Sequence, residues 1–113
     1  MTLRETAERL HLSVRCCDDG LDRVVTGAYT GDLMSDVIAN ARAGNVWITM
    51  QVHLNIVAVA VIKELAGIII VQGRQPAADT LKRATDEHVP IAVSELPAFE
   101  VAGRLYADLF SGA

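Results

Sequence analysis

Apolar residues recur at two periods along this chain, and the alternation between the two predicts an α/β fold. Stripes with the helical spacing of three to four residues fall in the ranges 2–10, 32–41, 55–65, 76–88 and 98–109. Continuous or alternating apolar runs typical of strands fall in the ranges 11–17, 23–29, 46–50, 67–71 and 89–93. Because strands and helices alternate from residue 46 onward, the sheet is predicted to be parallel there, with right-handed crossovers. We therefore predict one three-layer α/β domain over residues 1–113, with a mostly parallel sheet of about five strands and helices on both faces.

The predicted helix 55–65 contains the most apolar stretch of the chain, Ile56–Ile62, which has no polar face. Val and Ile favour strands, but this stretch must connect two parallel strands and Asn55 is a good helix cap, so we predict a helix. A helix that is apolar all round is buried on every side, which so small a domain rarely achieves alone. We therefore predict that the chain homodimerises. The predicted interface residues are Tyr29, Trp47, Val57, Val59 and Val61.

The amino-acid composition also predicts an interface, and the charge of the chain limits which classes of partner we expect. The chain is 51% hydrophobic with a mean hydropathy of +0.31, which predicts apolar surface at a subunit or partner interface. The formal charge of −4 and the scattered basic residues argue against nucleic-acid binding. The longest apolar run is far shorter than the roughly 18 residues of a membrane span, and no secretory signal pattern opens the chain. We expect a cytoplasmic protein in which the adjacent Cys16 and Cys17 are reduced.

Four polar loops follow predicted strands and lead into helices, so they should share the rim of the sheet where ligands of open α/β folds bind. Helix N-termini attract anions, and Arg74 beside Gly73 adds a positive charge. His53 offers a hydrogen-bond donor in the same rim. The same residue types also cap helices and form turns without any ligand, so that interpretation stays open. The candidate ligand-binding residues are Asp32, Gln51, His53, Asn55, Gly73, Arg74 and Ser94.

The sequence carries no recognisable catalytic apparatus. The phosphate-binding pattern G-x-x-x-x-G-K-[ST] and the dinucleotide-binding pattern G-x-G-x-x-G are both missing. No serine or cysteine stands in a pattern that predicts a nucleophile with a partner base, and no cysteines and histidines have zinc-ligand spacing. We predict that the chain is not an enzyme and has no catalytic residue, no metal and no cofactor, with an adenine nucleotide as a candidate ligand.

Four segments together resemble a stand-alone DRTGG domain along nearly the whole chain. They are Gly31–Val37, Val46–Ala60, Ala66–Val71 and Ser94–Tyr106. The most specific part of the resemblance is the pattern W-I-T-x-Q-x-H-x-N, which begins at Trp47. Of the residues that give the family its name, Gly31, Asp32 and Gly73 are retained, whereas Leu33 stands where the family has arginine.

The resemblance implies a regulatory role and a fold similar to the N-terminal domain of HPr kinase/phosphorylase. DRTGG domains accompany CBS domains in regulated pyrophosphatases and precede the catalytic part of some phosphotransacetylases. We therefore predict a non-catalytic regulatory or assembly module that homodimerises and acts with a partner enzyme. Two alternatives stay open: a sensor domain for an adenine nucleotide or another anion, and a partner-dependent subunit of an enzyme complex, either hydrogenase-associated or HPr kinase-like by label only.

Overall fold

A five-stranded sheet forms the middle of the protein, in the strand order β1-β5-β4-β3-β2. The computed structural model describes residues 1–110. The strands are β1 (Ser13–Cys16), β2 (Gly27–Thr30), β3 (Asn45–Thr49), β4 (Gly67–Ile70) and β5 (Ile91–Val93). Strands β2 to β5 pair in parallel, and β1 pairs antiparallel with β5 at one edge. The predicted, mostly parallel sheet is therefore confirmed.

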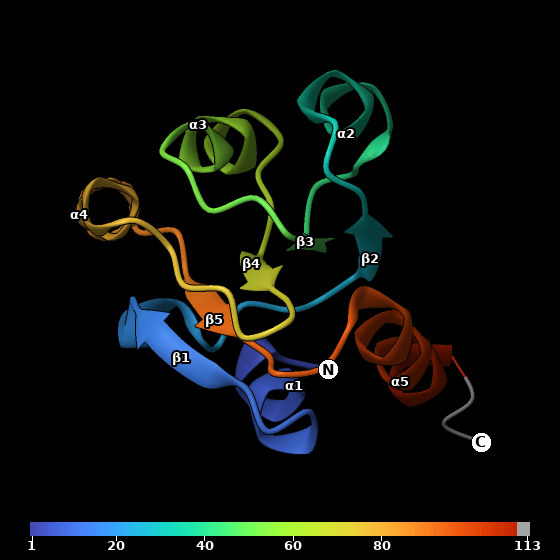
Figure 1. Ribbon diagram of the computed structural model, residues 1–113. Coiled ribbons are helices and arrows are strands. Elements are labelled where there is room, and N and C mark those ends of the chain that lie inside the picture. Colours follow the sequence, from blue (N-terminus) through green and yellow to red (C-terminus); the bar gives the residue numbers. More distant parts are fainter. Residues whose placement is uncertain (111–113) are drawn as a thin grey trace.

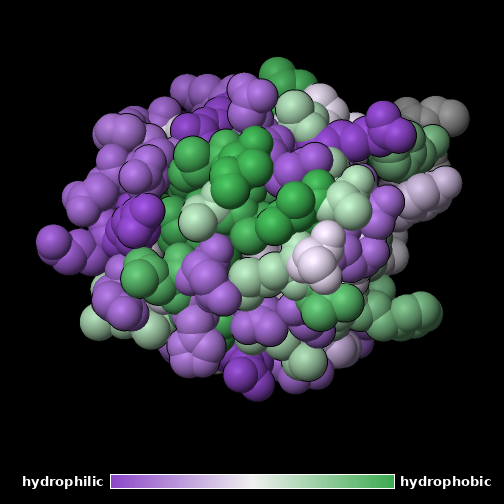
Figure 2. Space-filling model, turned by 90° about the horizontal axis from the view of Figure 1, so that it is seen from above, coloured by the Kyte–Doolittle hydropathy of each residue, from purple (hydrophilic) through white to green (hydrophobic). Residues whose placement is uncertain are grey.

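Helices cover both faces of this sheet (Figure 1). They are α1 (Leu3–Arg9), α2 (Met34–Asn40), α3 (Asn55–Ile62), α4 (Ala78–Glu87) and α5 (Ala98–Phe110). Helices α2, α3 and α4 lie on one face, and α1 and α5 lie on the other. The three-layer α/β architecture is confirmed. Seen from the side of α2, α3 and α4, the surface carries an apolar patch bordered by polar side chains (Figure 2). None of the helices described is long and apolar enough to cross a membrane.

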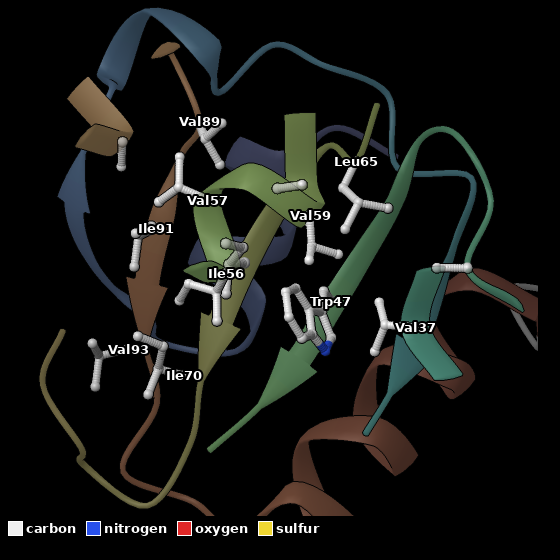
Figure 3. Close-up of a cluster of buried hydrophobic side chains, with 14 residues drawn as sticks. Val37, Trp47, Ile56, Val57, Val59, Leu65, Ile70, Val89, Ile91 and Val93 are labelled. Atoms are coloured by element: carbon white, nitrogen blue, oxygen red, sulfur yellow. The ribbon is translucent and has the colours of Figure 1, made fainter. Parts of the chain in front are cut away.

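Trp47 is the largest side chain of the core between the sheet and helices α2 to α4. It is fully buried and lies between Val37 of α2 and Val59 of α3 (Figure 3). Its indole Nε1–H donates a hydrogen bond of 2.8 Å to the carbonyl oxygen of Gly31, so its polar group is satisfied without water. A second core, on the other face, joins the sheet to α1 and α5.

The structure corrects the predicted dimer interface at three of its five positions. Trp47 and Val57 are 0% exposed and Val59 is 5% exposed, so the chain's own core already covers them. Tyr29 is half-buried, and its hydroxyl donates to the Asp36 carboxylate. Only Val61, at 43% exposure, presents a large part of its side chain to a partner. The error arose because composition counts apolar residues but does not show which of them the monomer can bury.

Helix α3 leaves one side uncovered in the monomer, as predicted for an apolar helix in so small a domain. Its inner side is buried against the sheet, but Ile62 is 67% exposed on its outer side. Helices α2 and α4 flank α3, and no element covers it from outside (Figure 1). The expectation that so small a domain does not bury this apolar helix on every side is therefore confirmed for the monomer.

The strand predicted over 23–29 is confined to β2 because the N-terminal segment pairs with its first part. Thr2 forms an isolated antiparallel bridge with Val24, and the N–H of Val25 donates to the carbonyl of Met1 at 2.8 Å. These hydrogen bonds satisfy the backbone that a longer β2 would have paired with β3. A capping box of Thr2 and Glu5 is present at the start of α1.

Candidate functional site

Asp32 ties the loop that follows β2 to the loop that follows β3. Its Oδ1 accepts hydrogen bonds from the Thr49 hydroxyl at 2.8 Å and from the Met50 N–H at 2.7 Å. Its backbone carbonyl accepts a third, of 3.0 Å, from the Gln51 side-chain amide. Asp32 has the residue type of a helix cap and precedes α2, but the N-cap position of that helix is Leu33. The carboxylate instead stabilises the loop that carries Gln51 and His53.

A cavity of about 180 Å³ lies between these two loops and the loop that follows β4. Four of the seven candidate residues line it: Asp32, Gln51, His53 and Arg74. The side chains of His53 and Arg74 are both exposed. In the described part of the chain, Arg74 has no ion-pair partner within 4.0 Å. The cavity therefore presents a guanidinium group that forms no ion pair with the described residues.

The other three candidates lie outside this cavity. Ser94 is buried; its hydroxyl accepts from the N–H of Leu96 at 3.1 Å, and its carbonyl accepts from the N–H of Gly73 at 2.8 Å. Gly73 has a left-handed backbone, with φ of +66°. Ser94 and Gly73 thus stabilise the loops that follow β5 and β4, as residues in turns do. Asn55 is exposed in the first position of α3, and its side chain makes no capping hydrogen bond.

Glu95 lies in a loop that the sequence places at the rim, but it is not among the predicted ligand-binding residues. A Cβ atom at Gly73 would collide with the Glu95 carboxylate, so this acid lies directly over the glycine. The only signal in the sequence was its place after a predicted strand, which many loop residues share. Its negative charge lies over the residue next to Arg74, so it weakens the attraction of an anion to this part of the rim.

The polar side chains at the rim are suited to binding an oxyanion. Among residues 1–110, no three His, Cys, Asp or Glu side chains are grouped so that they could hold a metal ion. The Oδ1 atom of the Asp32 carboxylate already accepts hydrogen bonds from the Thr49 hydroxyl and the Met50 N–H. What remains available is one guanidinium, one imidazole and one amide, which together can hydrogen-bond an oxyanion.

The two cysteines form a separate, partly buried pair at the end of β1. Both thiols are free; Cys17 Sγ lies 3.0 Å from Cys16 Sγ and donates at 3.3 Å to the carbonyl of Val89. Burial, followed by the hydrogen bond with Cys16, raises the pKa of the Cys17 thiol to about 12. A thiol with so high a pKa carries almost no thiolate at neutral pH and is a poor nucleophile.

Raising the pH is expected to destabilise the protein through Cys17. The unfolded thiol ionises near its ordinary pKa of 9.0, whereas the folded thiol stays protonated up to about 12. The unfolded state therefore loses its proton first, and the free energy of unfolding falls as the pH rises through this range. Urea titrations between these two pH values should show a steeper decline for the unmodified chain than for Cys17→Ala. Equal slopes would contradict the buried, protonated thiol.

Comparison with known proteins gives evidence about the fold of the chain. No family model matches the chain, and no curated protein matches it. One solved structure that it resembles is the crystal structure of the CBS and DRTGG domains of the regulatory region of Clostridium perfringens pyrophosphatase, complexed with its activator diadenosine tetraphosphate. The TM-score is 0.68 at 13% sequence identity, and the match covers 92% of this chain but only 45% of that one. The likeness shows a shared fold, over less than half of the other protein's chain.

Proposed function

We propose that this chain is a non-catalytic regulatory module that binds a small phosphate-bearing ligand, an adenine nucleotide, at the rim cavity. The observation that carries the proposal is the unpaired Arg74 guanidinium beside His53 and Gln51 in one cavity. At about 180 Å³ this cavity is smaller than a typical drug-sized pocket, so it suits a phosphate group, with the rest of the ligand on the surface.

The comparison with the pyrophosphatase supports a regulatory role. That protein's matching chain is a regulatory region, and its activator is a dinucleotide with a polyphosphate bridge. By analogy, we propose that this chain is a single DRTGG-like domain over residues 1–113, and that it homodimerises and acts on a partner enzyme in the cytoplasm. The two reduced cysteines fit a reducing compartment. The analogy rests on fold alone, so binding must be tested directly on this chain.

Replacing Arg74 by alanine is expected to weaken binding of inorganic phosphate, ADP and diadenosine tetraphosphate. A hydrogen bond to a charged group is worth about 1.5–3 kcal/mol, which corresponds to a roughly 10- to 150-fold loss of affinity. Isothermal titration calorimetry of both proteins measures it. The matched control is Arg83→Ala, which removes an exposed arginine of α4 that pairs with Glu87. Flat titrations of the unmodified chain with all three ligands would contradict the proposed sensing function.

A further inference from the structure

Helix α5 carries an exposed stripe of aromatic side chains. Phe99 is 89% exposed, Tyr106 is 67% exposed and Phe110 is 60% exposed. Their spacing of seven and four residues, with Gly103 between the first two, places all four residues on one side of the helix. The sequence has two Phe, two Tyr and one Trp, so most of its aromatic side chains lie on this single stripe. Such a concentration is typical of a protein–protein interface, where aromatic residues are enriched.

The monomer's fold does not use this stripe. Helix α5 packs onto the sheet through Val101 and Leu105, which lie on a different side and are 0% and 1% exposed. The ring centroids of Tyr106 and Phe110 are 5.0 Å apart, so these two side chains already pack on each other on the surface. Since the core is complete without the stripe, its exposure leaves a large apolar area in water that a partner would cover.

Gly103 opens a notch in the middle of the stripe. A Cβ atom added at this position would have no heavy atom within 4 Å, so the space above it is empty. Glycine weakens the interior of a helix relative to alanine, and the φ angle of Gly103 is not positive, so its backbone does not require glycine. A close approach by another helix is the remaining structural use of a glycine here.

We propose that a second copy of this chain docks on the stripe, with the two α5 helices antiparallel and crossing midway between Phe99 and Tyr106, close to Gly103. In that arrangement Phe99 of each copy lies next to Tyr106 of the other, because the two residues are at equal distances on either side of the crossing. The aromatic side chains of each copy thus pack against the open space beside Gly103 in the other, and the two-fold axis repeats this contact. This inference rests on the homodimer of the proposed function and adds the surface that forms it.

The charges beside the stripe favour the same antiparallel partner. Glu100 and Arg104 flank it and form an ion pair of 3.7 Å within one helix, with the acid nearer the N-terminus. An antiparallel copy brings its Arg104 close to Glu100 and its Glu100 close to Arg104. The stripe is therefore complementary in charge to itself when reversed.

A neighbouring groove extends this surface to the edge of the sheet. It has a volume of about 400 Å³ and lies between α5 and β2, which has no strand on its outer side. Tyr106 and Phe110 form part of one wall, and Tyr29, one of the residues predicted for the interface, belongs to the other. The groove gives the second copy more surface to cover than the helix alone.

The test compares variants of exposed α5 residues by sedimentation velocity at micromolar concentration. The unmodified chain should sediment as a dimer of twice the 12.1 kDa chain mass. The double variant Phe99→Glu/Tyr106→Glu should weaken the dimer at least about 30-fold, as expected on loss of interface hot spots. Gly103→Leu should also weaken it while leaving thermal unfolding of the monomer intact, because leucine fills the notch yet favours a helix.

A charge swap makes the test specific for the antiparallel arrangement. Glu100→Arg and Arg104→Glu should each weaken the dimer, and the double swap should restore it. The comparison variant is Val61→Glu, on the exposed side of α3. Loss of the dimer in Val61→Glu but not in the α5 variants would overturn the α5 surface and leave the homodimer standing. A monomeric unmodified chain would overturn the homodimer as well, while the phosphate titrations would still decide the ligand.

Discussion

Replacing Trp47 by alanine is expected to cause a large loss of stability, lowering the free energy of unfolding by about 3–5 kcal/mol. The side chain is 0% exposed and lies at the centre of the core under α2 and α3. Truncation of a buried tryptophan to alanine costs about 3–5 kcal/mol, against a total stability of about 5–15 kcal/mol for a domain. The change also removes the donor that satisfies the Gly31 carbonyl. Urea titrations followed by far-UV circular dichroism measure the loss without relying on the tryptophan signal.

The matched control for this prediction is Trp47→Phe. Phenylalanine keeps most of the apolar volume but lacks the N–H, so a smaller loss of stability is expected than for alanine. The difference between the two variants separates the cavity from the missing hydrogen bond. A free energy of unfolding for Trp47→Ala within 1 kcal/mol of that of the unmodified chain would mean that Trp47 is not in the core, and the aromatic side chain would again be available for an interface.

Replacing Asp32 by alanine is expected to have the second largest effect. The change removes the acceptor of two short hydrogen bonds and leaves the hydroxyl of Thr49, which is 1% exposed, without its partner. Because a hydrogen bond to a charged group contributes about 1.5–3 kcal/mol and Asp32 itself is exposed, we expect a loss near the lower limit, about 2 kcal/mol. Urea titration of the free energy of unfolding measures it.

Two further variants identify the hydrogen bonds as the cause of this loss. Asp32→Asn keeps one side-chain oxygen that accepts from both donors, so it should lose less stability than alanine. Thr49→Val removes the hydroxyl donor, so adding it to Asp32→Ala should cost less than the sum of the two single changes. Additive losses in the double variant would show that the Asp32 carboxylate does not stabilise the loop through Thr49.

The same two loops link stability to the proposed ligand site. Asp32 holds the loop that presents Gln51 and His53, whereas Arg74 comes from the loop that follows β4. Arg74→Ala is therefore expected to lower ligand affinity without lowering stability, because this exposed side chain forms no ion pair with the described residues. Measuring both quantities for both variants separates a binding residue from one that supports the loop.

The sequence by itself determined the fold class and the position of the candidate rim. The two apolar periods are local properties, and a strand followed by a helix and a second strand can close only as a parallel pair with a right-handed crossover. The carboxyl ends of such strands share one edge, which is why Asp32, His53 and Arg74, far apart in sequence, were expected together and do line one cavity.

The roles of individual polar residues were decided by the tertiary structure. Asp32 has the residue type and position of a helix cap, but the Thr49 hydroxyl and the Met50 N–H provide better-placed donors from another loop. Likewise, β1 pairs antiparallel with β5, although the two strands are far apart in the chain. Local propensity does not predict such pairing, because it depends on which backbone edges the rest of the fold leaves open.

Which apolar side chains are buried in the core and which face solvent could likewise not be predicted from the sequence. Trp47 and Val57 were assigned to an interface because the chain contains much apolar surface, yet the sheet and three helices bury both completely. The exposed aromatic residues are Phe99, Tyr106 and Phe110, on a helix whose aliphatic stripe alone predicted its packing. Hydrophobicity establishes that a side chain should leave water, but only the packed structure shows whether the chain's own core has room for it.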